Sequence, residues 1–341
     1  MHSPITGKDM KLTRERSSMD FRKETFEIMF HSYRCEDSGE QFTTTSLDEL
    51  NTNQVYNKYR DKFNIPFQDE IIRIREKYGL AAAKMSEILG FGINSYRQYE
   101  AGEMPSIANA KSIQMLDEPK YFIDMVEMCG TLDEKVKTKC IQKAQLLIEE
   151  KKRNNVDLKF KEYVLGNHFP DIYTGYRNPN FEKFTEMVVY FSEQNAPFKT
   201  KMNKLLFYAD FLMFKQSCFS ISGIRYQAID MGPVPNNFQS IFEYLAKNGE
   251  IDILATEIPQ GYTGEQFKAK QDRPFKSYLF SETELEVMKK VSLVFQSSNS
   301  IDIIELSHLE EAWKKNEKNK SAISYEYAFD LNPMEYEAIH I

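Results

Sequence analysis

The stretch between Pro66 and Pro105 constrains the fold more than any other part of this chain. Its apolar residues recur at the spacing of an α-helix, and four glycines interrupt the pattern every few residues. Because glycine and proline break helices, the segment predicts a bundle of short helices rather than one long helix. We expect helices at Ala81–Leu89 and Asn94–Glu100, with a tight turn at Gly90–Gly92 between them.

The apolar residues of this bundle are expected to share one inner face. Its members are Ile71, Ile74, Leu80, Met85, Ile88, Leu89, Ile93, Tyr96 and Tyr99. The second helix turns four polar groups outward, namely Asn94, Ser95, Arg97 and Gln98. Asparagine and glutamine can pair with adenine in the major groove of DNA, and arginine suits guanine or phosphate. The pattern favours a helix-turn-helix DNA reader over the alternative, an ordinary solvated face of a small helical domain.

The charges of this segment are balanced. Residues 69–115 carry six basic and six acidic side chains, within a chain of net charge −7. We therefore expect modest electrostatic affinity for DNA, so that specificity depends on a homodimer bound to a palindromic operator.

The residues from Ile74 to Ser106 resemble the Xre-type helix-turn-helix of MqsA-type antitoxins. The resemblance implies that Asn94 and Gln98 meet bases. Gln98 stands where that family often has arginine, which implies a different operator sequence.

Two short frames near the N-terminus, Ser3–Gly7 and Cys35–Gly39, resemble the paired knuckles of the zinc ribbon in the same family. Three of the four expected ligands are replaced, by Ser3, Thr6 and Ser38. A structural zinc ion normally has four thiolate or imidazole ligands, so the sequence predicts a ribbon without metal. We expect apolar packing to compensate, and the candidate residues are Ile5, Met10, Phe21 and Phe42.

Four motifs in the second half of the chain resemble the Panacea domain of SocA-like antitoxins. They are Lys204–Asp210, Gly223–Ala228, Gly232–Pro235, and Ser307-His308 with Trp313. The resemblance implies a domain that holds a protein toxin inactive by binding it. The candidate residues for the toxin interface are Tyr208, Asp210, Arg225, Tyr226, Pro233 and Pro235.

Some of the same polar residues could also be arranged as an acid/base set. These are Asp210, Arg225, Asp230 and His308. Hydrogen bonding inside the fold is the commoner role of such residues, and the sequence has no phosphate loop or nucleophile elbow. We therefore expect a protein without catalytic activity or cofactor. The four cysteines form no CxxC pair, which indicates reduced thiols.

The chain divides into five segments, and its fold class is mainly α with minor β. In order, they are a small β-rich ribbon at 1–60, a helix-turn-helix bundle with a helical extension at 61–152, a linker at 153–179 rich in Gly, Pro and Asn, an α-rich Panacea-like domain with a small β-hairpin at 180–320, and a tail at 321–341. Local patterns add a strand within Glu24–Arg34, a helix at Asp48–Arg60 and the hairpin near Ile251–Tyr278. Ser281 and Glu284 stand at the spacing of a capping box.

These features predict a bacterial or phage antitoxin that neutralises its cognate toxin by direct binding and represses its own operon. Its partners would be that protein toxin, double-stranded operator DNA and a second copy of the chain. No stretch has the length of a membrane span and the start has no secretory signal, so we expect a cytoplasmic protein with no membrane partner. A transcriptional regulator without a toxin and a proteolytic adaptor remain alternatives.

Overall fold

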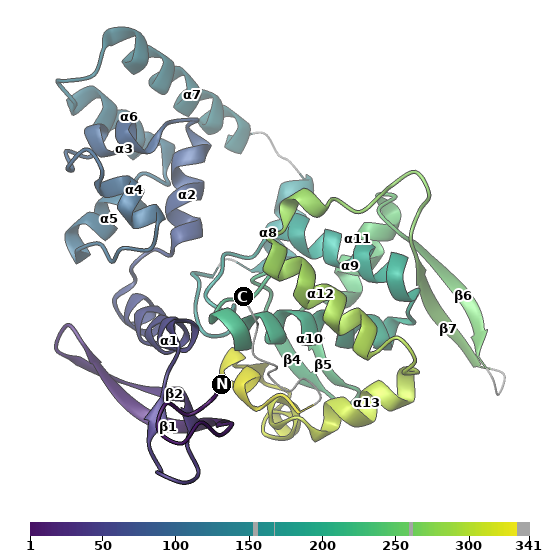
Figure 1. Ribbon diagram of the computed structural model, residues 1–341. Coiled ribbons are helices and arrows are strands. Elements are labelled where there is room, and N and C mark those ends of the chain that lie inside the picture. Colours follow the sequence, from purple (N-terminus) through teal and green to yellow (C-terminus); the bar gives the residue numbers. More distant parts are fainter. Residues whose placement is uncertain (153–155, 167, 259–261, 333–341) are drawn as a thin grey trace. The chain divides into compact units, whose positions relative to one another are not determined.

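The computed structural model of the protein describes residues 1–152, 156–166, 168–258 and 262–332 (Figure 1). These residues form two compact units. One contains residues 15–30 and 54–159, and the other contains residues 1–14, 31–53 and those from 160 onward. We call the first the helical unit and the second the C-terminal unit.

The N-terminal sheet has the strand order β1-β2-β3. Its strands are β1 (Lys11–Phe21), β2 (Glu24–Arg34) and β3 (Gln41–Phe42), and α1 (Thr45–Phe63) follows. Arg22 and Lys23 have φ values of 48° and 69° and form the two-residue turn between β1 and β2. Positive φ at both central positions is the geometry of a type I′ hairpin turn. The predicted strand is confirmed, and the helix predicted at 48–60 is longer than expected.

The helical unit contains the predicted short helices. They are α2 (Gln68–Lys77), α3 (Ala82–Ile88), α4 (Ser95–Glu100), α5 (Ile107–Met115), α6 (Pro119–Met128) and α7 (Glu134–Lys152). Ile71, Ile74, Met85 and Tyr96 are fully buried in one core. Ser106 caps α5 by accepting a hydrogen bond from the amide of residue 109. The predicted bundle is therefore confirmed, with helix bounds that differ by one residue at each predicted end except the last.

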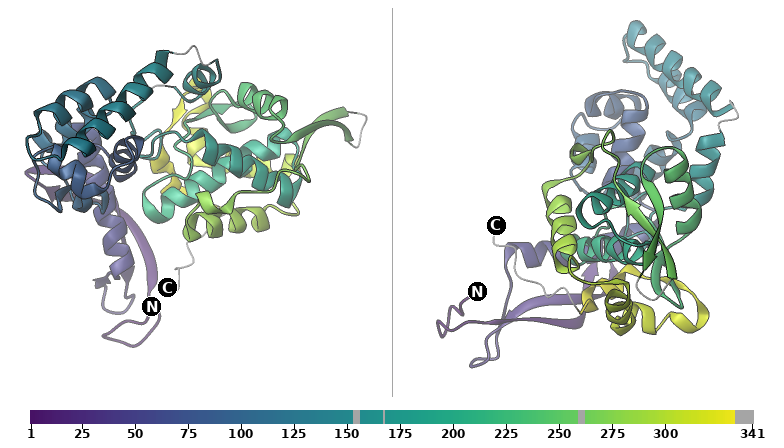
Figure 2. Two further views of the ribbon diagram at one scale, coloured as in Figure 1. Left: turned by 90° about the horizontal axis from the view of Figure 1, so that it is seen from above. Right: turned by 90° about the vertical axis from the view of Figure 1, so that its right-hand side faces the viewer.

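The C-terminal unit combines helices with two small sheets (Figure 2). Its helices are α8 (Val156–Leu165) from residue 160 onward, α9 (Phe181–Asn195), α10 (Lys199–Ser217), α11 (Phe238–Lys247), α12 (Glu282–Val294), α13 (Ser300–Leu309) and α14 (Glu311–Lys314). Its strands are β4 (Tyr226–Ile229), β5 (Gly232–Pro235), β6 (Asp252–Ile258), β7 (Tyr262–Lys268) and β8 (Ala322–Ile323). The strand orders are β5-β4-β8 and β6-β7. The capping box of Ser281 and Glu284 at the start of α12 is confirmed.

Helix α10 is the centre of the C-terminal unit. Every residue from Lys201 to Lys215 is buried, and the helix packs against α9, α12, α13, β5 and β7. Its rings pack into an aromatic core, where Phe211 stacks on Tyr325 with ring centroids 4.4 Å apart and meets Tyr226 edge to face at 5.7 Å. A helix that is apolar on most sides is typical of a domain centre.

The prediction of a linker at 153–179 is wrong for the residues that the structure describes there. Residues 153–155 and 167 lie outside the described ranges, but α8 is helical and Thr174 and Tyr176 are buried. The hydroxyl of Ser220 donates to the carbonyl of Thr174 at 2.8 Å. Gly175 has φ 59°, and a Cβ there would lie 2.6 Å from Ser220. The glycine therefore permits a packed turn, not a solvated connection.

The prediction of a C-terminal tail from residue 321 is also wrong as far as residue 332. Ala322 and Ile323 pair antiparallel with β4. Tyr325 is fully buried, and its hydroxyl donates to the carbonyl of Ile224 at 2.8 Å. The remaining residues, 333–341, lie outside the described part of the chain.

The predicted fold class, mainly α with minor β, is confirmed. Within the described ranges, no helix is both long and apolar enough to cross a membrane.

Candidate functional site

The turn between α3 and α4 is held by buried hydrogen bonds. The amide of Tyr96 donates to Oγ of Ser86 at 3.0 Å, and the Tyr96 hydroxyl donates to the carbonyl of Ile71 at 2.9 Å. Gly90 provides the positive φ of 67° that the turn requires. At the other end of α4, the side-chain amide of Asn109 donates to the Tyr99 hydroxyl at 2.9 Å. These bonds orient α4 relative to α2 and α5.

The outer face of α4 is open. Asn94, Arg97 and Gln98 are exposed, and Ser95 is half-buried. In the described part of the chain, the side chains of the three exposed residues form no hydrogen bond or ion pair within the protein. Three polar groups without internal partners therefore stand side by side on a fixed helix, available to an external ligand.

Ile93 does not belong to the inner face. Its side chain is 74% exposed, so this part of the predicted core is wrong. The physical reason is that Ile93 precedes the first residue of α4, where the turn departs from helical spacing. An exposed apolar side chain thus stands next to Asn94.

All three basic residues of α2 form ion pairs within the helical unit. Arg73 and Lys77 both pair with Asp117, at 2.8 Å and 2.9 Å. Burial alone would raise the pKa of Asp117, but its bonds to these cations lower that pKa to about 2. Arg75 pairs with Glu100 at 2.5 Å. These residues stabilise the bundle, and their charge is largely compensated inside it.

The two N-terminal knuckles keep their turns without a metal cage. The amide of Gly7 donates to the carbonyl of Ser3 at 2.9 Å, and that of Gly39 donates to the carbonyl of Cys35 at 2.8 Å. Hydrogen bonds from Ser3, Ser38 and Thr6 lower the pKa of the Cys35 thiol to about 6. Among the residues that the structure describes, no three His, Cys, Asp or Glu side chains gather as a metal site would require. Around the Cys35 sulfur, the side chains of Ser3, Thr6 and Ser38 stand at the positions where the zinc-ribbon family has metal ligands.

The predicted apolar compensation is only partly right. Met10 and Phe42 pack in a small cluster with Cys35, as expected. Ile5 is 55% exposed, and Phe21 packs instead against Tyr59 with ring centroids 5.0 Å apart. The sequence could not separate these cases because all four residues are equally apolar.

Cys35→Ala should flatten the dependence of thermal stability on pH. The folded pKa is depressed from 9.0 to about 6, so the thiolate contributes stability that is complete above pH 9 and is lost as the pH falls through 6. Melting temperatures measured between pH 5.5 and 9 should rise with pH more steeply in the unmodified chain than in the variant. Cys129→Ala, which removes a thiol from the helical unit, is the control and should keep the slope. Equal slopes for the unmodified chain and Cys35→Ala would contradict the assignment.

The six candidate residues for the toxin interface lie mostly inside the C-terminal unit. Tyr208, Asp210 and Tyr226 are 0% exposed, and Pro233 and Pro235 are buried in β5. Only Arg225 is partly accessible, and it pairs with Asp171. A fully buried side chain offers no area to a partner, so the structure speaks against direct toxin contacts at the five buried positions. The residues of these motifs are buried in the core of the C-terminal unit, so their pattern reflects the packing of this fold.

Asp210 is the hub of this buried polar core. Its carboxylate accepts hydrogen bonds from the amides of Ile221 and Ser222, both at 2.8 Å. The hydroxyls of Ser222 and Tyr226 donate to its second oxygen at 2.5 Å and 2.8 Å. Four donors from 221–226 converge on one side chain of α10, which fixes this segment against the central helix.

Lys204 is also fully buried, directly beneath β5. Its ammonium group donates to the carbonyl of Pro233 at 2.9 Å, and burial lowers its pKa to about 7. Gly232 is necessary for this approach, because a Cβ there would lie 2.8 Å from Lys204 Nζ and 2.4 Å from Ser307 Oγ. The lysine and glycine of two separate motifs are therefore coupled by close packing.

The predicted alternative of an acid/base set finds no support in the geometry. The Asp210 carboxylate already accepts four hydrogen bonds, and Arg225 forms an ion pair with Asp171. Asp230 is exposed and pairs with Lys320 at 3.1 Å. His308 stacks on Trp313 with ring centroids 3.8 Å apart, and the indole donates to the carbonyl of Ile229 at 2.8 Å. The three charged groups thus pair with different residues, and the ring of His308 packs on Trp313.

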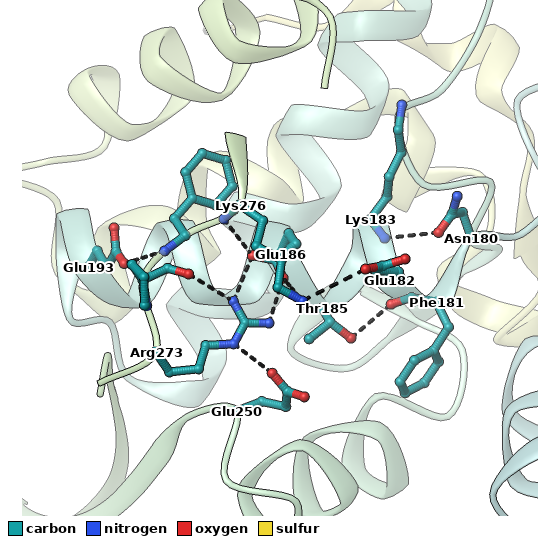
Figure 3. A network of polar contacts seen from close by, with 12 residues as sticks. Asn180, Phe181, Glu182, Lys183, Thr185, Glu186, Glu193, Glu250, Arg273 and Lys276 are labelled. Atoms are coloured by element: carbon teal, nitrogen blue, oxygen red, sulfur yellow. Dashed lines mark hydrogen bonds and ion pairs between the residues drawn. The ribbon is translucent and has the colours of Figure 1, made fainter. Parts of the chain in front are cut away.

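A second polar network was not predicted from the sequence (Figure 3). Arg273 forms a two-pronged pair with the fully buried Glu186, at 2.7 Å and 2.5 Å, and donates through Nε to Glu250 at 2.6 Å. The amide of Lys276 donates to the same Glu186 at 3.0 Å. The network fastens the segment after β7 to α9 and borders a cavity of about 230 Å³. No local pattern links residues 186, 250 and 273, so only the fold reveals it.

Comparison with known protein families assigns two regions of the chain. Residues 1–126 match the family described as the antitoxin component of a bacterial toxin-antitoxin system, MqsA. Residues 202–314 match the family described as antitoxin SocA-like, Panacea domain. No curated protein matches the chain. The predicted resemblance to both families is confirmed, and residues 127–201 lie between the two matched regions.

Proposed function

Because two regions of the chain match antitoxin families, we propose that it is the antitoxin of a toxin-antitoxin system. In this proposal the C-terminal unit binds a cognate protein toxin and keeps it inactive, and the helical unit binds operator DNA. The observation that carries the DNA part is the set of exposed polar side chains on α4, which have no internal partner in the described structure. The chain would act in the cytoplasm, without a cofactor and without catalysis.

DNA reading would centre on the first turn of α4. Asn94 and Gln98 would pair with bases, and Arg97 would contact a guanine or a phosphate. The half-buried Ser95 would contact the sugar-phosphate backbone of the DNA. Ile93 extends the predicted set, since an exposed apolar group can contact the methyl group of thymine. A homodimer would place two such surfaces on a palindrome and repress the chain's own operon.

Toxin binding would use the outside of the C-terminal unit. Tyr208, Asp210, Tyr226, Pro233 and Pro235 would act indirectly, because they shape the surface by fixing β4 and β5 against α10. The toxin itself would be contacted by exposed side chains on the surface around β4, β5 and α10.

Co-expression with the product of the adjacent gene tests the antitoxin proposal. Induction of that gene alone should arrest growth, and the full chain expressed with it should restore growth and be recovered in a complex with the product. Asn94→Ala combined with Gln98→Ala should still restore growth, because neutralisation needs the C-terminal unit and not DNA. Failure of the full chain to protect at any expression level would refute the proposal.

The same experiment separates the alternatives. If induction of the adjacent gene alone left growth unchanged, a transcriptional regulator without a toxin would be favoured. A partner whose half-life shortens when the chain is present would favour a proteolytic adaptor.

A further inference from the structure

Helix α7 carries an unusual concentration of positive charge. Between Glu134 and Glu149 the sequence contains four lysines and no acidic residue. The whole chain has a net charge of −7, so this is a local departure from its overall acidity. Helix α7 lies beyond residue 126 and before residue 202, outside both matched families.

Three of these lysines form a stripe along one side of the helix. Lys135, Lys139 and Lys143 are spaced four residues apart, so they lie on the same face, and all three are exposed. The opposite face is buried through Cys140 and Ala144, which pack in the core of the helical unit. None of the three lysines forms an ion pair within the described ranges of the chain. We call these three residues the lysine stripe.

The helix that carries the stripe packs beside the first helix of the helix-turn-helix. Sγ of Cys129, at the end of α6, donates to the carbonyl of Glu87 on α3 at 3.6 Å. Met85 and Ile88 of α3 are buried in the same core as Cys140 and Ala144 of α7. The start of α7 and helix α3 therefore share one region of the helical unit.

This position suits contact with a nucleic acid backbone. In helix-turn-helix proteins the first helix of the motif crosses the DNA backbone while the second enters the major groove. Side chains beside α3 therefore lie near phosphates when α4 reads bases. Arg73, Arg75 and Lys77 are compensated by Asp117 and Glu100, so α2 supplies little positive charge of its own. The lysine stripe supplies charge that α2 lacks.

We propose that the lysine stripe of α7 is a second DNA contact surface, which binds backbone phosphates flanking the bases read by α4. It accounts for how a motif with balanced charge obtains electrostatic affinity. The inference rests on the proposed DNA binding of the helical unit. Because lysine contacts to phosphate carry no sequence information, the stripe adds affinity and salt dependence without changing the preferred sequence.

The test measures binding of the full chain to two duplexes, one from directly upstream of its own reading frame and one of unrelated sequence, over a range of KCl concentrations. Replacing Lys135, Lys139 and Lys143 with glutamine should reduce the slope of log K against log salt by about 2.7, because each neutralised phosphate contributes ~0.9 to that slope. The affinity for both duplexes should fall by the same factor. Matched control substitutions remove the same charge from exposed lysines of the C-terminal unit, Lys247→Gln, Lys289→Gln and Lys318→Gln.

The slope of log K against log salt distinguishes the possible results. An unchanged slope in the stripe variant, or a change equal to that of the control variant, would overturn the inference while leaving base reading by α4 intact. A fall confined to the upstream duplex would also overturn it, because it would show sequence readout. If the unmodified chain bound neither duplex, both the inference and the DNA part of the proposed function would fail. Melting curves for all three proteins verify that the exposed substitutions leave the fold unchanged.

Discussion

Replacing Asp210 with alanine is expected to lower the free energy of unfolding by about 4 kcal/mol, in the range found when a buried charged or multiply bonded group loses its partner. The substitution leaves two amides and two hydroxyls without their acceptor in the centre of the C-terminal unit. It also opens a cavity at a position that is 0% exposed. Folded domains have total stabilities of about 5–15 kcal/mol, so the C-terminal unit would be severely weakened.

Urea denaturation followed by circular dichroism measures this effect. Asp230→Ala is the matched control, because that carboxylate is exposed and, within the described ranges, pairs only with Lys320; its effect should stay within about 0.5 kcal/mol. Asp210→Asn should fall between the two. Its amide oxygen can still accept from the backbone, and the hydroxyls of Ser222 and Tyr226 can reverse to accept from its NH₂ group. If Asp210→Ala lowered the free energy of unfolding no more than Asp230→Ala, the hydrogen bonds of the Asp210 carboxylate would not be what stabilises this core.

Asn94→Ala combined with Gln98→Ala is expected to abolish specific operator binding. Each bidentate contact to a base contributes about 1–3 kcal/mol of discrimination, so the double substitution should cost about 2–6 kcal/mol. Affinity for a duplex of unrelated sequence should hardly change, since the substitutions remove no charge. Both side chains are exposed and without internal partners in the described structure, so the melting temperature should not change.

Fluorescence anisotropy with the upstream duplex and an unrelated duplex gives both affinities. Gln296→Ala combined with Asn319→Ala removes the same two side-chain types from exposed positions of the C-terminal unit and should leave both affinities unchanged. An intact preference for the upstream duplex in the Asn94/Gln98 variant would exclude α4 as the reading helix. This result is separable from the salt-slope test, because base contacts alter specificity and phosphate contacts alter the slope.

Local sequence patterns predicted the helical elements well where the determining interactions are themselves local. The glycine-interrupted pattern indicated α3, α4 and the turn between them, and the Ser281/Glu284 spacing indicated the start of α12. The strand within Glu24–Arg34 was also predicted. Hydrogen bonds between residues three or four apart and the periodicity of one buried face can be read directly from a sequence.

The predictions failed where burial depended on distant segments. The Gly- and Asn-rich residues near Gly175 have the composition of a linker, yet they pack against Ser220. Ile5 and Ile93 are apolar but exposed, and Asp210 and Lys204 are charged but buried. Composition states what a side chain prefers on average, whereas its actual exposure depends on which other segments fold over it.

The bundle between Pro66 and Pro105 was thus determined by the sequence itself, since helix-breaking residues and apolar spacing act over a few positions. The tertiary structure alone decided the roles of the residues in the second half of the chain. There, one carboxylate collects donors from a segment eleven to sixteen residues away, and Arg273 joins Glu186 across 87 positions. Contacts of that kind leave no local pattern, because the two partners become neighbours only after the chain between them has folded.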